Sequence, residues 1–280
     1  MKSHTYIFLP VTLLVLLFAS GCVTPTGGEQ LNVLTTEEEI QLGKTMSAEV
    51  EKEETPLKNN AIQVYVHTIG ERLADQSPRQ DVPYEFTVID NPEVVNAFAL
   101  PGGHMYVYTG LMKICDNEAQ LASVMAHEIA HVAAKHHGEA YTRQLMLERV
   151  RELIVARGAG PGTAAGTQVL GQLFALKFSK VQEQEADRMG MDILFRAGYK
   201  PESMVDFMRK LAAYEQEQGG GARPSGPVLR FLVNLTASHP ATADRIANLD
   251  NLLLQYPVNI RNQSPTYFDR YKVNVLDVLK

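Results

Sequence analysis

The sequence predicts an α+β fold that is predominantly helical, with a small β-sheet or hairpin directly before one apolar helix. Helix-start signals and long helical stretches occupy most of the chain from residue 35 onward, whereas β-branched and aromatic residues gather in the region 84–108. About 245 residues follow residue 35, which is enough for one large domain with a well-packed core. We therefore expect a single domain over residues 35–280.

The individual elements follow from local signals. Thr35 and Glu38 form a capping-box start for a helix that runs to about Glu54. A second helix is expected over 60–76 and a strand over 84–90, and the sheet is completed by Phe98 and the segment 105–108. Later helices are expected to begin near Asn117, His137, Gln168, Val181, Pro201 and Pro240.

Three later stretches differ from these regular elements. Residues 158–162 and 219–224 are rich in glycine and are predicted to be mobile loops. Residues 169–178 are apolar but interrupted by Gln172 and Lys177, which favours a packed or groove-lining helix. Membrane contact is the alternative on length alone.

The N-terminus has the pattern of an exported lipoprotein. Lys2 precedes a short apolar stretch over 7–18, which is too short to span a bilayer, and Ala19-Ser20-Gly21 leads into Cys22. We expect a signal peptide over 1–21, a lipid anchor on Cys22 and a flexible tether over 22–34. An ordinary signal peptide or an anchor helix is the alternative, which the position of the cysteine disfavours.

Charge and cysteine content argue against nucleic-acid binding and against a disulfide. The formal net charge is −6, or −7 once Lys2 has left with the signal peptide, and no basic cluster is present. This pattern gives no support to nucleic-acid binding. If Cys22 carries lipid, Cys115 is the only remaining thiol, so an intramolecular disulfide is excluded.

His127, Glu128 and His131 form a His-Glu-x-x-His motif on the apolar helix. Residues four apart lie on one face of a helix, about 6 Å apart along its axis, so both imidazoles can point at one metal ion. Glu128 lies beside that face, where it can reach a metal-bound water. A core helix with hydrogen-bonded histidines is the structural alternative, but burying two histidines and a glutamate together is costly without a neutralising partner.

A second motif supplies the third metal ligand. Glu183 and Asp187 are also four residues apart, so that Glu183 can bind the metal while Asp187 orients a ligand imidazole. His137 would lie about 15 Å along the axis and off the ligand face if the first helix continued through Ala134. Glu185 would point about 200° away from Glu183. Two histidines and one carboxylate leave an open tetrahedral position, as in a hydrolytic zinc site.

These motifs together resemble the HtpX and CAAX-prenyl-protease family of gluzincin zinc metalloendopeptidases. The segments that resemble it, in family order, are 96–103 (NAFALPGG), 106–110 (YVYTG), 116–131 (DNEAQLASVMAHEIAH), 179–187 (SKVQEQEAD) and 238–240 (SHP) with Arg245. Lys180 stands where an arginine is more usual. The resemblance covers roughly residues 35–255 and is closest to periplasmic lipoprotein members, such as LoiP and the protease part of BepA.

The resemblance implies a zincin-type metallopeptidase domain that binds one Zn²⁺ per chain. It places His239 and Arg245 at the catalytic centre, where they would stabilise the charge on the scissile carbonyl oxygen. His239 has a second reading as an occupant of the open zinc position that keeps the enzyme latent, and a third as a helix-start histidine without a catalytic role. The hairpin, Asn96-Ala97-Phe98-Ala99, would offer a strand edge to an extended peptide.

The family also implies a place in the cell. We expect an outer-membrane lipoprotein that faces the periplasm, cleaves unfolded or misfolded envelope proteins in protein quality control and associates with envelope assembly machinery. One alternative is a chaperone or assembly factor for outer-membrane proteins that rarely cleaves, although Glu128 and Glu183 favour an enzyme. Another is a small-amide hydrolase or exopeptidase, which would need a cluster for recognising a chain terminus that we do not find.

Overall fold

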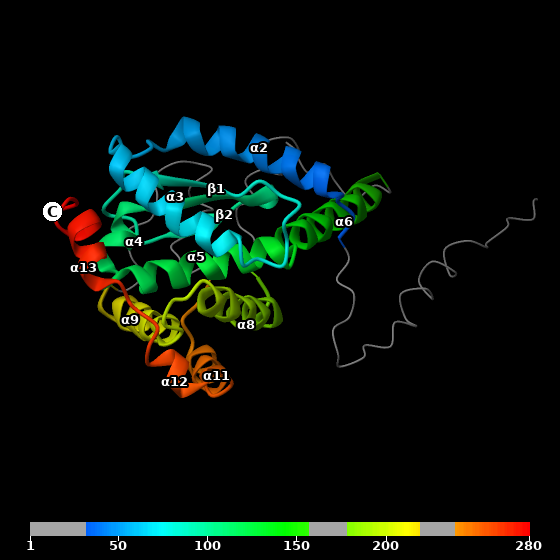
Figure 1. Cartoon of the computed structure of the whole chain (residues 1–280). Coiled ribbons are helices and arrows are strands. Elements are labelled where there is room, and N and C mark those ends of the chain that lie inside the picture. Colours follow the sequence, from blue (N-terminus) through cyan, green and yellow to red (C-terminus); the bar gives the residue numbers. More distant parts are fainter. Residues whose placement is uncertain (1–31, 157–177, 219–238) are drawn as a thin grey trace, which may run out of the picture. The chain divides into compact units, whose positions relative to one another are not determined.

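The computed structural model of the protein describes residues 32–156, 178–218 and 239–280 (Figure 1). Several sequence predictions lie outside the described residues: the signal peptide, Cys22, the segment 169–177, the helix start at Gln168 and both glycine-rich stretches. None of the described helices combines the length and the apolar character that a membrane crossing requires. The predicted α+β fold, predominantly helical with a small sheet, is confirmed.

The first two helices begin at the predicted caps. Helix α2 (Thr36–Glu53) starts at a complete capping box, in which the Thr35 hydroxyl accepts from the Glu38 amide and the Glu38 carboxylate accepts from the Thr35 amide. Helix α3 (Asn60–Ala74) starts at Asn59 and buries Ile62, Val66, Ile69 and Leu73 along one face. This spacing of three to four residues explains why α3 packs as an amphipathic helix.

The sheet has three strands in the order β1-β3-β2. Strand β1 (Glu85–Ile89) runs parallel to β3 (His104–Tyr108), and β2 (Ala97–Ala99) pairs antiparallel with β3, which places β2 at the edge. The turn between β2 and β3 is a short 3₁₀ helix, η1 (Pro101–Gly103), in which Gly102 and Gly103 have φ values of 76° and 101°. A side chain at Gly103 would lie 2.5 Å from the Pro83 carbonyl oxygen, so glycine is required there.

Helix α5 (Glu118–Ala133) is the centre of the domain. It follows the short helix α4 (Thr109–Ile114), begins at the Asn117 cap and is buried from Glu118 to Val132. In Figure 1 it lies between the sheet and a second layer formed by helices α8 (Lys180–Arg196) and α9 (Glu202–Gln218). Helix α11 (Ala243–Leu253) packs on α8 and α9. Both faces of α5 are therefore covered by protein.

The chain breaks between α5 and α6 (His136–Ala156). Ala134 caps α5, and Lys135 adopts a left-handed conformation with φ 59°. The sequence argument against His137 assumed an unbroken helix through Ala134, and that assumption is wrong. The intrinsic helix propensity of alanine is overridden by the local packing of this turn.

Helices α5 and α8 approach each other closely at a glycine. Helix α8 begins at a capping box between Ser179 and Gln182, and two turns later Gly190 faces α5. A Cβ atom at Gly190 would lie 3.0 Å from Cα of His127 and 3.1 Å from its nitrogen. The missing side chain lets the two helices that carry the motif residues lie directly against each other.

A C-terminal segment that the sequence did not predict returns to the start of α5. It contains the short helices α12 (Val258–Arg261) and α13 (Phe268–Tyr271) and a π-helical turn, η2 (Lys272–Leu276). Tyr271 and Val275 are fully buried, and the Tyr271 hydroxyl donates to the Met112 carbonyl at 2.6 Å.

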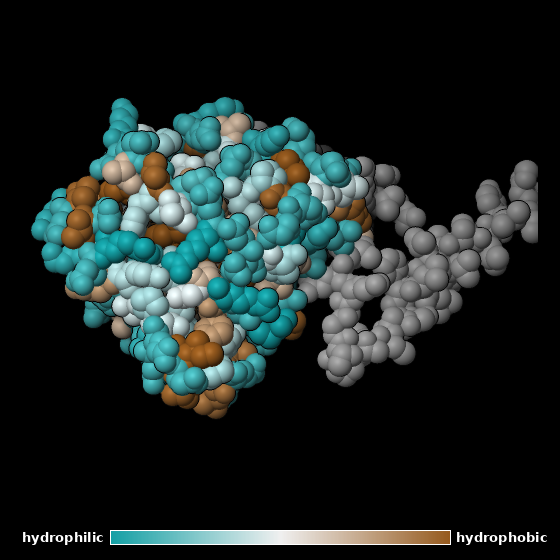
Figure 2. All heavy atoms as spheres, in the orientation of Figure 1, coloured by the Kyte–Doolittle hydropathy of each residue, from teal (hydrophilic) through white to brown (hydrophobic). Residues whose placement is uncertain are grey.

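The C-terminal segment also neutralises a buried carboxylate on α5. Glu118, which is fully buried, accepts hydrogen bonds from Arg270 and from the hydroxyls of Tyr65 and Tyr199, at 2.5 and 2.7 Å. The molecular face in Figure 2 is mostly hydrophilic with separate hydrophobic spots. Most of the large exposed apolar side chains of the described residues lie in the C-terminal part: Leu254, Val258, Ile260, Phe268, Val273 and Val278. The segment is therefore held to the domain by a few buried contacts, those of Arg270, Tyr271 and Val275, while much of its apolar surface stays exposed.

Candidate metal centre

Helix α5 points His127 and His131 into one buried site. Their Nε2 atoms are 3.1 Å apart, and the exposed fractions of the two residues are 7% and 0%. This convergence follows from the four-residue spacing of the motif on a regular helix. Glu128 is also buried, and its Oε2 accepts from the backbone amide of Ala99 at 3.2 Å.

Helix α8 brings two carboxylates to these histidines. Glu183 Oε2 lies 3.5 Å from Nε2 of His127, and its Oε1 lies 3.6 Å from Nε2 of His131. One turn further along, Asp187 Oδ1 lies 3.1 Å from Nδ1 of His127. The structure thus places Glu183 in front of the two imidazoles and Asp187 behind one of them.

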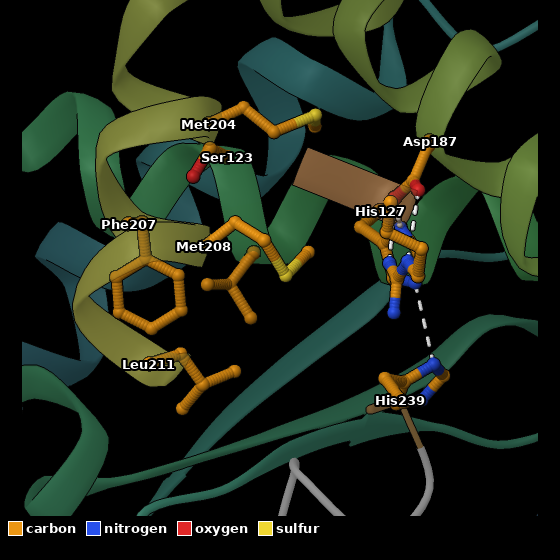
Figure 3. Close-up of a pocket in the computed structure, with 10 residues that line it drawn as sticks. Ser123, His127, Asp187, Met204, Phe207, Met208, Leu211 and His239 are labelled. Atoms are coloured by element: carbon orange, nitrogen blue, oxygen red, sulfur yellow. Dashed lines mark hydrogen bonds and ion pairs between the residues drawn. The ribbon is translucent and has the colours of Figure 1, made fainter. Parts of the chain in front are cut away.

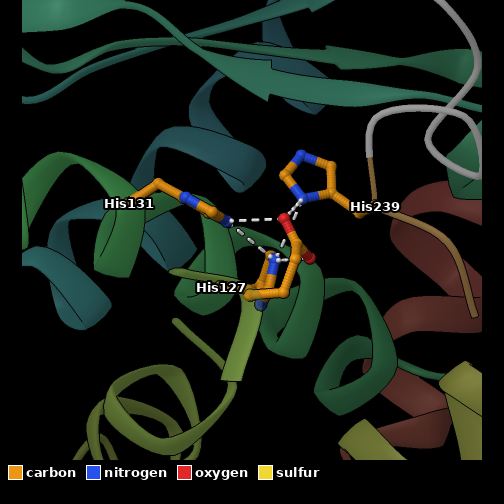
Figure 4. Close-up of side chains that lie close together, drawn as sticks. His127, His131 and His239 are labelled. Carbon is orange, nitrogen blue, oxygen red and sulfur yellow. Dashed lines mark hydrogen bonds and ion pairs between the residues drawn. The ribbon is translucent and has the colours of Figure 1, made fainter. Parts of the chain in front are cut away.

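His239 occupies the remaining corner of the cluster (Figure 4). Its Nδ1 is 2.9 Å from Glu183 Oε1 and 3.3 Å from His127 Nε2. Its other ring nitrogen, Nε2, lies 3.4 Å from Oε1 of Glu128. His239 therefore contacts both the cluster and Glu128, which agrees with the reading in which it fills the fourth position.

The donor set fits a tetrahedral transition-metal ion such as zinc. One atom each from His127, His131, Glu183 and His239 lie within 4.8 Å of one another. Four ligands at zinc distances on tetrahedral corners are separated by about 3.3 Å. Five of the six pairs lie 2.9 to 3.6 Å apart when the nearer oxygen of Glu183 is taken for each, which is close to this value. Three imidazole nitrogens and one carboxylate are also the ligand types that zinc prefers.

The charges of the cluster explain its pKa shifts. Burial alone would lower the pKa of His127, but Asp187 and Glu183 outweigh it and raise the pKa to about 9. Burial would raise the pKa of Glu183, yet His239 and His127 hold it well below its usual range. Burial, with the neighbouring His127, lowers the pKa of His131. The buried carboxylates of Glu183 and Asp187 therefore give the site a negative charge that favours the binding of a cation.

Arg245 lies behind the cluster, where all three of its guanidinium nitrogens are engaged. Nε and Nη2 bind the two oxygens of Asp187 at 2.9 and 2.6 Å. Nη1 lies 2.7 Å from Glu183 Oε2 and donates to the Pro240 carbonyl at 3.2 Å. The sequence analysis expected Arg245 to stabilise an oxyanion. The observed contacts instead favour a role in positioning the two carboxylates and the turn that carries His239.

The residues predicted as a substrate edge lie next to Glu128. Strand β2 is the edge strand, and Asn96, Ala97, Phe98 and Ala99 are all buried. Because the Ala99 amide donates to Glu128, the edge and the motif helix meet at this carboxylate. An extended chain that added to β2 would therefore pass beside Glu128.

An apolar pocket opens beside His127 (Figure 3). Helix α9 supplies most of its apolar lining, and residues of α5 and of the metal cluster form the rest: Ser123, Val124, His127, Asp187, His239 and Arg245. The apolar lining residues from α9 are Met204, Phe207, Met208 and Leu211. Two methionines make the wall adaptable, because the unbranched side chain has several accessible rotamers.

Two residues near the cluster were missed in the sequence. His136 Nδ1 lies 2.9 Å from Nδ1 of His131, and the Phe178 ring stacks on the His131 ring with a centroid distance of 4.0 Å. On an unbroken helix His136 would not face His131, so the sequence held no signal for it. His137 and Glu185, the rejected candidates for a third ligand, are outside the group of four.

The fold is that of a zincin-type metalloprotease. Three features define it: a buried helix with His-Glu-x-x-His, a second helix that supplies a glutamate and an aspartate, and an edge strand beside the glutamate of the first motif. The family model of peptidase family M48 matches residues 60–253, more than half of the chain. The chain therefore belongs to peptidase family M48.

Named relatives agree with this assignment. The chain is 30% identical over 188 residues to the beta-barrel assembly-enhancing protease of Yersinia pestis, covering 64% of this chain and 38% of that protein. It is 29% identical over 229 residues to the Escherichia coli K12 protein of that name, with coverage of 79% and 45%. With the mitochondrial metalloendopeptidase OMA1 of Schizosaccharomyces pombe it shares 29% identity over 216 residues, with coverage of 74% and 58%. The chain spans about two fifths to three fifths of the length of these relatives.

Proposed function

We propose that the protein is a zinc-dependent metalloendopeptidase that hydrolyses peptide bonds in misfolded or unassembled proteins of the bacterial cell envelope. The observation that carries this proposal is the convergence of His127, His131, Glu183 and His239 beside the buried carboxylate of Glu128. Family membership supports the protease class. The substrates, the metal and the compartment are part of the proposal.

Metal binding, proton transfer and orientation of a ligand are assigned to different residues of the site. His127, His131 and Glu183 would hold one zinc ion, which, when bound, supplies a Lewis acid that activates water and polarises the scissile carbonyl. Glu128 accepts the proton of the attacking water and delivers it to the leaving amine. Asp187 fixes the tautomer of His127 by accepting a hydrogen bond at Nδ1.

His239 keeps the site in a resting form in this proposal. Its Nδ1 lies among the metal-facing atoms and its Nε2 lies 3.4 Å from Glu128. Both the fourth corner and the general base are thus engaged by one side chain. Cleavage then requires His239 to leave, which would protect correctly folded neighbours of the enzyme.

The surroundings of the site favour extended, apolar peptide segments. Strand β2 lies at the edge of the sheet and ends beside Glu128, to which the Ala99 amide donates, and the α9 pocket provides an apolar wall beside His127. Unfolded segments expose both a free backbone and apolar side chains, whereas folded proteins bury them. Relatives that are named beta-barrel assembly-enhancing protease add support for a protease that acts in protein assembly, and we extend this to misfolded or unassembled envelope proteins and to association with envelope assembly machinery.

Digestion of β-casein by the purified chain with zinc tests the activity. Glu128→Gln should abolish cleavage while zinc content and folding stay unchanged, because only the proton acceptor is lost. Glu93→Gln, at an exposed position, is the matched control and should cleave like the wild type. Cleavage by a clean Glu128→Gln preparation would overturn the mechanism. If neither the wild type nor His239→Ala cleaves casein, although both bind it and prevent its aggregation, the protein is the chaperone or assembly factor instead.

We also propose that Cys22 carries the lipid that holds the protein to the outer membrane, on its periplasmic side. The support is the short apolar stretch that ends in Ala19-Ser20-Gly21-Cys22. Cys22→Ser should move the protein from the membrane to the soluble periplasmic fraction without changing casein cleavage. A variant that stays with the membrane after a high-salt wash would point to another anchor.

A further inference from the structure

His127 and His131 each direct one ring nitrogen, Nδ1, away from the cluster, and these two nitrogens have different kinds of partner. Nδ1 of His127 faces a carboxylate oxygen of Asp187 at 3.1 Å. Nδ1 of His131 instead faces Nδ1 of another imidazole, His136, at 2.9 Å. Metal-binding histidines usually present this nitrogen to a carboxylate, a carbonyl or water, so a histidine in this place is unusual.

The backbone is bent to make this contact. Lys135 has φ 59°, a conformation that residues with a Cβ atom rarely adopt, and it separates α5 from α6. This residue interrupts the helix between α5 and α6, so that the His136 side chain lies against His131, which it would not face on a continuous helix (Figure 1). The His136 side chain is fully buried.

The tautomers follow from the geometry. Nε2 of His131 faces the other cluster atoms, so it must be free of a proton when it binds a metal, and the ring proton is then on Nδ1. That proton can only be donated to His136 if Nδ1 of His136 accepts it. The proton of His136 is then on Nε2, which lies 3.5 Å from Oε2 of Glu185.

Helix α8 therefore supports both histidines through carboxylates on two sides. Asp187 reaches His127 directly, and Glu185 reaches His131 through His136. Glu185 has a partly exposed side chain, whereas Asp187 is buried. The chain His131–His136–Glu185 thus runs from the cluster toward the surface.

We propose that His136 is a positioning residue of the metal site: its Nδ1 accepts the Nδ1 proton of His131 and fixes that ring as an Nε2 ligand, while its own Nε2 faces the Glu185 carboxylate at 3.5 Å. This inference rests on the proposed function as far as metal binding is concerned. It does not depend on peptide cleavage.

Metal affinity tests the proposal without any activity measurement. Zinc affinity of the full chain is measured by competition with a chromophoric chelator, and the ligand field is recorded as the absorption spectrum of the Co²⁺-loaded protein. His136→Leu keeps bulk but removes the acceptor, and it should bind zinc about 10- to 100-fold more weakly. His136→Asn keeps an acceptor oxygen close to the position of Nδ1, and it should recover most of the affinity and the wild-type Co²⁺ spectrum.

A matched histidine separates this role from general packing. His137→Leu changes the next residue, which is outside the group of four, and should leave the zinc affinity unchanged. Glu185→Gln should weaken zinc binding by less than His136→Leu, because Glu185 contacts His136 and not the ligand His131. If His136→Leu fails to fold, the comparison of His136→Asn with Glu185→Gln still decides the matter, because the proposal requires near-wild-type affinity in the first and a loss in the second.

The proposal is overturned if His136→Leu, or Glu185→Gln in its place, binds zinc and Co²⁺ like the wild type. It is also overturned if His136→Asn is no better than His136→Leu. A wild-type chain that binds zinc tightly but never cleaves casein would remove the peptidase function and leave this inference standing. The two failures are therefore distinguishable.

Discussion

Replacement of Arg245 with methionine separates a positioning role from a catalytic one. The guanidinium makes a bidentate contact with Asp187 and an ion pair with Glu183, and the exposed fractions of the three residues are 3%, 1% and 3%. Removing one partner from a buried ion pair leaves an uncompensated charge and costs about 3–5 kcal/mol. For a domain of this size, that loss corresponds to a decrease in Tm of roughly 6–20 °C.

The effect should depend on pH with a defined sign. The pKa of Asp187 is lowered in the folded protein, because hydrogen bonds from His127 and Arg245 outweigh burial. Such a group contributes stability above its unfolded pKa of about 4 and loses that contribution as pH falls through the folded value. The variant lacks part of this contribution, so the difference in stability between wild type and variant should shrink in acid.

Urea unfolding of the metal-free proteins at neutral and acidic pH measures the loss, and zinc competition measures the effect on the site. Arg245→Lys keeps the charge without the bidentate geometry and should give an intermediate loss. Arg209→Met is the control, because Nη2 of Arg209 donates to both oxygens of Asp250 at 2.8 Å but the arginine side chain is about half exposed. Its loss should stay below about 1 kcal/mol. An Arg245→Met protein with wild-type stability and zinc affinity but a reduced kcat would refute the positioning role.

Four other outcomes follow from the structure. His239→Ala should increase casein cleavage or self-cleavage, because it frees the fourth metal position and Glu128. A decrease in kcat of roughly 10²–10³ without any increase in self-cleavage would show that His239 stabilises the oxyanion instead. The pKa of His127 is raised to about 9, so its proton competes with zinc and the apparent affinity should rise about tenfold per pH unit between about pH 6 and 8, measured with a chelator. Burial raises the pKa of Glu139 to about 7. The wild type should therefore lose stability as pH rises from about 4.5 through 7, because the buried carboxyl becomes charged. Glu139→Gln should raise the Tm at about pH 8 but not at about pH 4. Gly190→Ala should cost roughly 0–2 kcal/mol, since overpacking against His127 exceeds the gain in helix propensity, and calorimetry that shows a more stable protein with unchanged zinc affinity would contradict the close contact.

Local signals in the sequence were enough for the helices and for most of the candidate site. Thr35 and Asn117 mark the starts of α2 and α5, because a capping side chain acts only on the amides of its own first turn. The grouping of His127, His131 and Glu183 follows from four-residue spacing once the two helices are adjacent. These features depend on neighbours in the chain, which a sequence displays directly.

The features that the sequence did not predict depend on tertiary contacts. The left-handed Lys135 places His136 against His131, and the expected helix start near His137 gave no sign of this conformation. The guanidinium of Arg245 has partners 58 and 62 residues away, and its orientation could not be read from its position in the chain. The parallel pairing of β1 with β3 was also not predicted, because local sequence patterns indicate strands but not which strands pair.

The attachment of the C-terminal segment to Glu118 has a consequence for where the folding unit ends. The family match stops at residue 253, but Arg270 supplies the charge that balances a carboxylate in the first turn of α5, and Tyr271 fills space in the main core. A chain shortened to the matched region would leave Glu118 buried with only two phenolic partners. Helix α13 and the first turn of the motif helix are therefore coupled through one buried carboxylate, so the folding unit extends beyond the part that sequence comparison outlines.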